Sequence, residues 1–170
     1  MKKTERRLLA ELVKNSKKSD RELGKILGVS QPTVSRTRNK LEKIGMIQEY
    51  TIVPDLTKLG FEVMAITTGR YIVPRTKETM DKAKAYMKKF PNILFSARAQ
   101  GMGKDAVIIS LHKNFTDYDN FMANLKTDWG NTVGEQASLL ISLKGFVAKP
   151  FSLKYLAEVI DTSKISSEKA

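Results

Sequence analysis

The chain contains no cysteine and only one histidine among its 170 residues. Without thiols it cannot form disulfides or thiolate metal sites, and a single histidine without an acidic cluster does not predict a zinc site. No run of about 18 apolar residues occurs, so no membrane-spanning helix is predicted. The N-terminus carries no apolar secretory segment. We therefore expect a cytoplasmic protein without a metal or cofactor and without a membrane partner.

Sequence motifs that carry catalysis are also missing. The chain has no P-loop, GxSxG or HExxH pattern. Gly101-x-Gly103 lacks a third glycine and a following helix, so it is a poor dinucleotide signal. His112 ends an apolar stretch beside Lys113, with no paired acid or nucleophile nearby in sequence, which is more typical of a structural histidine. The sequence therefore predicts that the protein is not an enzyme.

Acidic residues are outnumbered by basic ones, and the formal net charge is +12. Residues 1–60 hold 14 Lys and Arg against 7 Asp and Glu, whereas residues 61–170 hold 16 against 11. The excess is therefore denser in the N-terminal third, which favours a polyanionic partner. Nucleic acid suits a basic helical region better than a membrane does. The alternative is a generally lysine-rich composition, as in some thermophiles.

Residues 30–45 have the features of one helix around which the chain is organised. Ser30 is a good N-cap, Pro32 suits the first turn, and Gly45 suits the left-handed position that closes a helix. Apolar or small side chains share one side of this helix: Val34, Thr37, Leu41 and Ile44. The opposite arc is polar and basic: Ser35, Arg36, Asn39, Lys40 and Lys43.

A helix with an apolar back and a cationic, amide-bearing front can enter the major groove of double-stranded DNA. Arginine can contact guanine, asparagine can contact adenine, and lysine and serine can hold phosphates. The predicted DNA-binding set consists of Gln31, Thr33, Ser35, Arg36, Arg38, Asn39, Lys40 and Lys43, with Arg21 and Lys25 from the preceding helix. The alternative is an ordinary amphipathic helix with a solvated basic face.

Two further helices are predicted before this stretch. Thr4 can cap the first, which runs to about Asn15, and Leu8, Leu9, Leu12 and Val13 form its buried stripe. Ser19-Asp-Arg-Glu22 is a capping box that opens the second, which buries Leu23, Ile26 and Leu27 and ends at Gly28. The order of helix, helix, short glycine turn and helix indicates a helix-turn-helix. Residues 46–53 alternate, which predicts either a DNA-contacting wing carrying Gln48 and Tyr50 or a strand that only covers the core.

The stretch SDRELGKILGVSQPTVSRTRNKLEKIGMIQEYTIVPDLTKLGFE resembles the N-terminal domain of the Lrp/AsnC (leucine-responsive regulator) transcription factors. The positions that match the family pattern are Asp20, Glu22, Leu23, Gly28, Val29, Ser30, Val34, Arg36, Leu41, Glu42, Gly45, Ile47, Leu59 and Gly60. One position departs from it, because family members usually carry an apolar residue where Arg38 stands. The stem of Arg38 can pack while its head reaches the DNA backbone, or the change can alter sequence preference.

The predicted organisation is a winged helix-turn-helix domain at 1–54, a linker at 55–60, a second domain at 61–150, and a C-terminal helix and tail at 151–170. After Phe61 the pattern gives a strand, a helix capped by Thr76, two strands flanking the turn at 101–105, a helix capped by Thr116, and a strand at 137–143. This βαββαβ order predicts a ferredoxin-like fold and an α+β protein overall. Ile93, Phe95, Ala97 and Ala99 are expected to share one face of their strand.

The resemblance implies that this second domain pairs sheet against sheet into a homodimer, with tetramers or octamers as larger assemblies. It also implies an amino acid or related metabolite as effector, bound between subunits. The family's effector loop corresponds here to Gly101-Met-Gly-Lys-Asp105, in which Gly101 and Gly103 can offer N–H groups and Asp105 a carboxylate. The alternative is a plain hairpin turn.

The leading hypothesis is a sequence-specific DNA-binding transcription regulator. Two alternatives stay open from the sequence. One is a haem-precursor-processing enzyme of the same architecture, for which His112, Arg98 and Arg70 are the candidate residues. The other is a metabolite sensor whose winged domain binds a protein.

Overall fold

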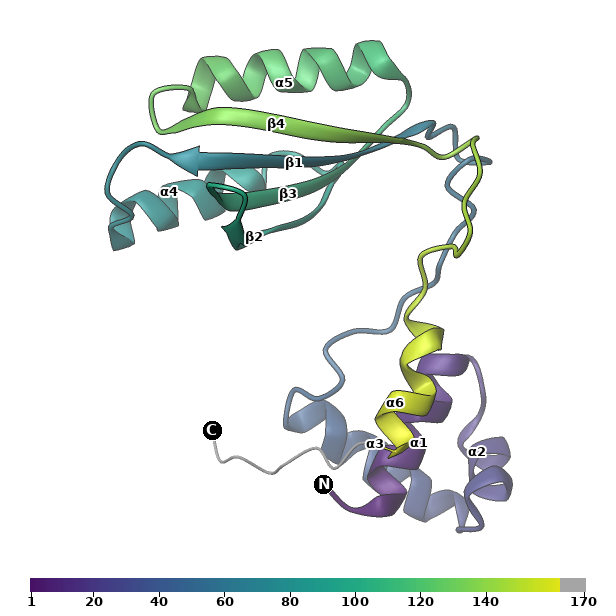
Figure 1. The fold of residues 1–170 in the computed structure, drawn as a ribbon. Helices are drawn as coiled ribbons and strands as arrows, with labels where there is room; N and C mark the ends of the chain where they lie inside the picture. Colours follow the sequence, from purple (N-terminus) through teal and green to yellow (C-terminus); the bar gives the residue numbers. More distant parts are fainter. Residues whose placement is uncertain (163–170) are drawn as a thin grey trace. The chain divides into compact units, whose positions relative to one another are not determined.

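The computed structural model describes residues 1–162, which form two compact units (Figure 1). One unit contains Met1–Val53 together with the segment that starts at Lys149, and the other contains Pro54–Ala148. The chain therefore passes between the units twice. None of the helices described combines the length and hydrophobicity that a membrane crossing requires.

The first unit is built on three helices: α1 (Lys3–Lys14), α2 (Asp20–Leu27) and α3 (Gln31–Lys43). Their inward stripes meet in one apolar cluster made of Leu8, Leu12, Leu23, Leu27, Val34 and Leu41. Every one of these positions lies at the helical spacing that the sequence shows. Helical periodicity thus predicts all six positions of this core.

Local capping fixes where α2 and α3 begin and end. The Ser19 hydroxyl accepts from the Glu22 N–H, and the Glu22 carboxylate accepts from the Ser19 N–H at 2.7 Å, which confirms the predicted capping box. Ser30 caps α3 as expected. A Cβ at Gly24 would lie 2.8 Å from the Val29 carbonyl oxygen, so the close turn between α2 and α3 requires glycine there. The predicted cap of α1 at Thr4 was wrong, since Lys2 precedes that helix.

Residues 46–53 do not form the expected strand. After Gly45, at φ +69°, the N–H groups of Met46 and Ile47 both donate to the Leu41 carbonyl, which turns the chain back over the helix end. Ile47 packs against the core, and Ile44, expected to be buried, is 60% exposed. An extended segment without a neighbouring strand has no ladder to join. Ile26, also expected inside, is 43% exposed.

The C-terminal segment completes this unit. A short 3-10 helix at Leu153–Leu156 leads into α6 (Ala157–Thr162), and both contact α1 (Figure 1). Ala157 is only 2% exposed. The sequence pattern predicts that residues 151–170 form a segment apart from the N-terminal domain. In the structure, the described part of this segment belongs to the N-terminal unit. The tail predicted from Ser163 lies outside the described residues.

The second unit has the ferredoxin-like order: β1 (Val63–Tyr71), α4 (Lys77–Met87), β2 (Ile93–Gly101), β3 (Lys104–His112), α5 (Phe115–Trp129) and β4 (Val133–Ser142). The sheet is antiparallel with strand order β2-β3-β1-β4. Thr76 caps α4 as predicted, but Asn114 rather than Thr116 caps α5. β3 and β4 each begin a few residues before their predicted starts.

Both helices of this unit pack on one face of the sheet. The ring centroid of Tyr86 in α4 lies 5.4 Å from that of Trp129 in α5, and the centroid of Phe90 lies 5.5 Å from that of Phe121. Ile108 of β3 joins the same cluster. This aromatic layer holds the two helices together above the sheet.

The other face of the sheet is apolar and carries no helix among the described residues. Register places these side chains in rows across the strands: Met64, Leu111 and Ile141; Ile66, Ile109, Leu139 and Phe95; Val107, Ala137 and Ala97. Leu139 is 69% exposed. The prediction that Ile93 and Phe95 share a face was wrong, because a register shift between them turns Ile93 toward the helices.

Candidate nucleic-acid interface

The outward side of α3 carries polar and basic side chains that are free to meet a ligand. Arg36, Asn39 and Lys43 are exposed and fall on the side opposite Val34 and Leu41. Asn39 and Lys43 make no side-chain hydrogen bond or ion pair within residues 1–162, and Arg36 uses only its Nε, which donates to the Pro32 carbonyl at 3.3 Å. This strip offers an amide and two cations together.

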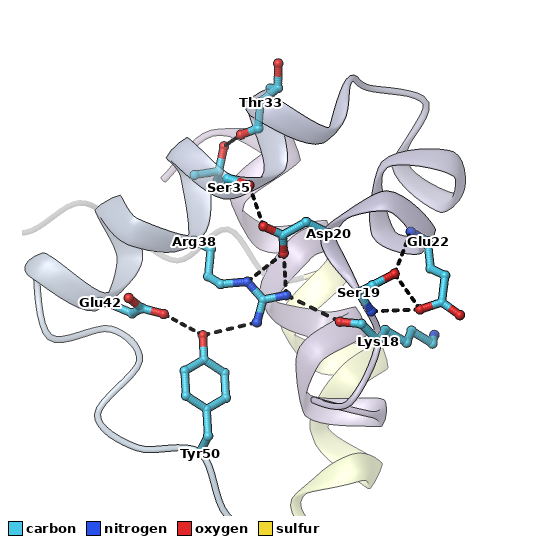
Figure 2. Close-up of polar contacts among 10 residues, drawn as sticks. Lys18, Ser19, Asp20, Glu22, Thr33, Ser35, Arg38, Glu42 and Tyr50 are labelled. Atoms are coloured by element: carbon cyan, nitrogen blue, oxygen red, sulfur yellow. Dashed lines mark hydrogen bonds and ion pairs between the residues drawn. The ribbon is translucent and has the colours of Figure 1, made fainter.

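On the flank facing α2, Arg38 is held by a polar network (Figure 2). Its Nε and a terminal nitrogen lie 2.9 and 2.7 Å from the same Asp20 oxygen, Oδ1. The Ser35 hydroxyl donates to the other oxygen of Asp20, at 2.5 Å. Asp20 therefore links two residues of α3 to the first turn of α2.

The electrostatics of this network favour its ionised form. Burial raises the pKa of Asp20, but the hydrogen bonds from Ser35 and Arg38 outweigh it and leave that pKa below its ordinary value. Burial lowers the pKa of Arg38, and its bonds to Tyr50 and Asp20 reverse the shift to a net increase. Both groups are charged across the physiological range, so their contact is a charge-assisted hydrogen bond.

Tyr50 fastens the segment after α3 to the same network (Figure 2). Its hydroxyl donates to Glu42 at 2.7 Å and accepts from Arg38 at 3.3 Å. The guanidinium of Arg38 also lies 5.7 Å from the centroid of the Tyr50 ring. Tyr50, one of the two residues named for the wing alternative, attaches its segment to α3 through these contacts.

On the opposite flank, Lys40 ties α3 to α1. Its Nζ lies 2.6 Å from Oε1 of Glu5, a carboxylate whose residue is only 7% exposed. The hydrogen bond from Lys40 is the main reason that the pKa of Glu5 lies below its ordinary value. Thus one flanking cation holds α3 to α1 and the other, Arg38, holds it to α2.

The structure therefore divides the predicted DNA-binding set. Ser35, Arg38 and Lys40 have partners inside the protein, so the geometry favours a positioning role for them. The remaining members point outward or lie at the helix start: Gln31, Thr33, Arg36, Asn39 and Lys43, with Arg21 and Lys25 exposed on α2. Sequence reasoning missed Glu5 and Asp20 as partners. The available signal was that each is an acid next to an otherwise basic surface.

The predicted effector loop is a tight hairpin between β2 and β3. Met102 and Gly103 have φ of 49° and 70°, as in a type I′ turn, and Gly101 pairs with Lys104. The carboxylate of Asp105 accepts from the Tyr71 N–H at 2.9 Å and lies 3.5 Å from Arg75. Asp105 is therefore already engaged within its own unit.

The candidate residues of the enzyme alternative do not form one site. The His112 side chain is fully buried beside Tyr118 and Phe121, and its Nε2 shares a 2.8 Å hydrogen bond with the Ser110 hydroxyl. Register places Arg98 on the helix-covered face of the sheet, beside Ala106, and Arg70 is exposed near Glu135. Because the His112 side chain is fully buried among these rings, it is not accessible to a substrate in this structure.

Known proteins are similar to this chain in sequence and in fold. The profile described as winged helix-turn-helix DNA-binding matches residues 1–48. LrpC, a helix-turn-helix transcriptional regulator of Bacillus subtilis, is 36% identical over 96 residues, which cover 55% of this chain and 62% of LrpC. The regulator Ptr1 of Methanocaldococcus jannaschii is 32% identical over 128 residues, covering 75% of this chain and 82% of Ptr1. The chain belongs to the Lrp/AsnC family of transcriptional regulators.

The likeness extends across both units. The solved structure of the regulator NMB0573 from Neisseria meningitidis, a complex with L-Met, superposes with a TM-score of 0.74 and covers 92% of this chain and 99% of its own. Its sequence identity is 17%, so it shows the shared fold. The predicted α+β architecture of this Lrp/AsnC protein, helix-turn-helix followed by a ferredoxin-like domain, is thereby confirmed.

Proposed function

We propose that this regulator acts in the cytoplasm by placing α3 in the major groove of a specific DNA operator. Arg36 and Asn39 would contact base edges, with Gln31 and Thr33 at the helix start. Lys43, Arg21 and Lys25 would hold phosphates. The observation that carries the proposal is how the charged side chains of α3 are divided. The cations on its flanks, Arg38 and Lys40, form ion pairs with α2 and α1. The outward side chains of Arg36, Asn39 and Lys43 still have donors available for a ligand.

The functional unit in this proposal is a homodimer formed through the open sheet face. Its rows contain Met64, Ile66, Ile109, Leu139 and Ile141, and no charged side chain interrupts them. A patch of this kind is self-complementary under a two-fold axis, and burying it removes a large apolar surface from water. Two copies of α3 can then meet half-sites one turn of duplex, or a multiple, apart. Tetramers or octamers would extend the same arrangement.

We further propose that a small amino-acid-like metabolite modulates the regulator through the β2–β3 hairpin. The L-Met complex of NMB0573, a protein of the same fold, supports this proposal. Gly101 and Gly103 can present backbone N–H groups to a carboxylate there. Asp105 can contribute only if the ligand replaces its bonds to Tyr71 and Arg75.

Selection of bound fragments from random DNA tests the operator proposal, and two variants separate base contacts from phosphate contacts. Arg36→Ala should relax the selected sequence at one position and cost about 1–3 kcal/mol on the preferred operator. Lys25→Ala should weaken binding to all sequences alike and reduce the log–log salt slope by about 0.9. Equal losses on all sequences from both variants would remove Arg36 from base contact. Failure to select any motif would reject the operator proposal.

Sedimentation of a sheet-face variant tests the dimer. Leu139→Lys should shift the protein to monomers at micromolar concentration, because each dimer would bury two unpaired charges. Phe115→Lys is the matched control, since Phe115 of α5 is similarly exposed, at 62% against 69%, but lies on a helix. The dimer proposal fails if both variants sediment like the wild type.

A further inference from the structure

The second unit contains a cavity between α4 and the helix-covered face of the sheet. Its volume is about 580 Å³, and its apolar walls come from Met80 and Met87 of α4, Phe90, and Trp129 of α5. Cavities of this size are typical of small-molecule sites. The cavity lies inside one unit. Asp105, which follows the hairpin, is among its lining residues, whereas the turn residues Met102 and Gly103 are not.

Small residues leave this space empty. Gly69 of β1 and Ala106 of β3 are register partners that line the cavity, and Ala83 of α4 also lines it. A Cβ at Gly69 would lie 2.5 Å from a methyl group of Val133, so that position cannot carry a larger side chain without rearrangement. Only Tyr86 is buried along α4, which therefore rests on the sheet mainly at its C-terminal end.

The cavity is lined by more positive than negative charge. Four cationic side chains line it: Arg75, Lys84, Lys88 and Arg98. The single carboxylate in the lining is that of Asp105, which forms an ion pair with Arg75 and accepts a hydrogen bond from the Tyr71 N–H. Arg98, Lys84 and Lys88 have no carboxylate partner within residues 1–162. An anion entering here would therefore meet cations that nothing in the described chain neutralises.

A buried hydrogen-bond acceptor, the side-chain oxygen of Gln136, gives a second condition for a molecule bound in the cavity. The Gln136 side chain lines the cavity, and its Nε2 donates to the Val133 carbonyl at 3.1 Å, which fixes the orientation of the amide. Its Oε1 is buried and has no hydrogen-bond partner among the described residues. Buried polar atoms rarely stay unpaired, so a donor on a bound molecule would satisfy it.

We infer that this cavity binds a small monocarboxylate with an aromatic or branched apolar body. The apolar body would contact Met80, Met87 and Trp129, and the carboxylate would pair with Arg98. Arg98 lies on β2 and Gln136 on β4, at opposite edges of the sheet. A ligand that also carries an N–H or O–H group at the end remote from its carboxylate would donate to Gln136. Binding requires neither DNA nor the turn glycines Gly101 and Gly103, so it can be tested separately from the proposed function.

The full-length protein supplies its own reporter, because Trp129 is the only tryptophan in the chain and lines the cavity. Titration with 3-phenylpropanoate and with 4-methylpentanoate should produce a saturable change in its fluorescence, with matching heat by calorimetry. The neutral 3-phenylpropanamide should bind at least about tenfold more weakly, because it lacks a charged partner for the cations. Acetate, which has the charge without the body, should not saturate at the same concentrations.

Variants locate the site. Arg98→Gln should weaken 3-phenylpropanoate about tenfold or more, the loss expected for a hydrogen bond to a charged group. Ala83→Leu should block binding by filling the cavity. Lys82→Gln is the matched control, because Lys82 pairs with Glu78 on α4 and does not line the cavity. Circular dichroism and the melting temperature of each variant establish that it is folded.

The inference is supported if both carboxylates bind, the amide does not, and only the cavity variants lose affinity. It is overturned if neither carboxylate binds at millimolar concentration, if the amide binds equally well, or if folded Arg98→Gln and Ala83→Leu proteins bind like the wild type. A loss caused by Gly103→Ala but not by Arg98→Gln would place the binding in the hairpin and would also overturn it.

Discussion

The two units are held together by different forces. The helix-turn-helix unit has a core cluster of six aliphatic residues, and its helices are joined at the surface by Lys40–Glu5 and Arg38–Asp20. The ferredoxin-like unit is held by its strand ladders and by an aromatic layer that includes Tyr86, Phe121 and Trp129. In the first unit, directional polar contacts orient α3, the helix proposed to contact DNA. In the second unit, backbone hydrogen bonds between strands set the geometry of the sheet, and the face of the sheet without helices is apolar.

This contrast suits the two proposed tasks, DNA binding by the first unit and dimerisation by the second. A helix proposed to contact bases must keep its rotation about its own axis, and the ion pairs on both flanks of α3 favour a single orientation. A dimerising sheet gains most from a broad apolar surface. The following changes should separate the two modes of stabilisation, beginning with the largest effect.

Leu41→Ala should unfold the first unit selectively. Leu41 is fully buried in the small aliphatic core, and truncation at such a site costs about 2–5 kcal/mol. Urea unfolding followed by circular dichroism should show an early helical transition, while Trp129 fluorescence reports a later one in the second unit. Coincident transitions in both signals would show that the units do not unfold independently.

Ala157→Asp should destabilise the first unit from its C-terminal segment. Ala157 is 2% exposed where α6 meets α1, and burying an unpaired carboxylate there should cost about 2–3 kcal/mol. Val159→Asp on the same helix is the control, because Val159 is 59% exposed and should change stability by less than about 0.5 kcal/mol. Equal urea midpoints for the two variants would argue against docking of α6.

Arg38→Met should cost the first unit about 1–3 kcal/mol, since it leaves Asp20 without its charged partner. Asp20→Asn should cost a similar amount, and a double-mutant cycle should give a coupling energy of about 0.5–3 kcal/mol. Arg36→Met, on the outward side of the same helix, should be neutral for stability but weaken DNA binding. Additive losses at Arg38 and Asp20 would contradict the positioning role.

The smallest effect should come from lowering the pH from 7.5 to 5.5, and in that range it should be confined to the second unit. Burial lowers the pKa of His112, and the partly opposing charge of Asp117 does not restore it. The unfolded state therefore takes up this proton first, so stability should decline as pH falls below about 6.5, by at most about 1.4 kcal/mol per pH unit. His112→Gln should flatten that slope in urea unfolding between pH 7.5 and 5.5. Asp20 and Glu5, whose folded pKa values are lowered, should weaken the first unit only under more acidic conditions, as pH falls through the carboxylate range.

Features encoded by near neighbours could be predicted from the sequence. The Ser19–Glu22 capping box, the Ser30 cap and the six-residue core each follow from spacing within one or two helical turns. The strand and helix order of the second unit also follows from local pattern. These are the contacts that a single segment determines by itself.

Contacts between distant segments could not be predicted in the same way. Arg38 meets Asp20 and Lys40 meets Glu5 only after the helices pack, and each helix alone places its cation on a solvated arc. The register shift after Ile93 depends on pairing with β3, which alternation within β2 does not reveal. The docking of α6 on α1 joins elements at opposite ends of the chain.

That docking has a consequence for synthesis. Because α6 follows the whole ferredoxin-like unit in the chain, residues 54–148 must be translated before the helix that covers α1 leaves the ribosome. At about 5–20 residues per second, this delay lasts roughly 5–20 seconds. The nascent helix-turn-helix therefore spends that interval without α6 against α1, and its stability then rests on the three N-terminal helices alone.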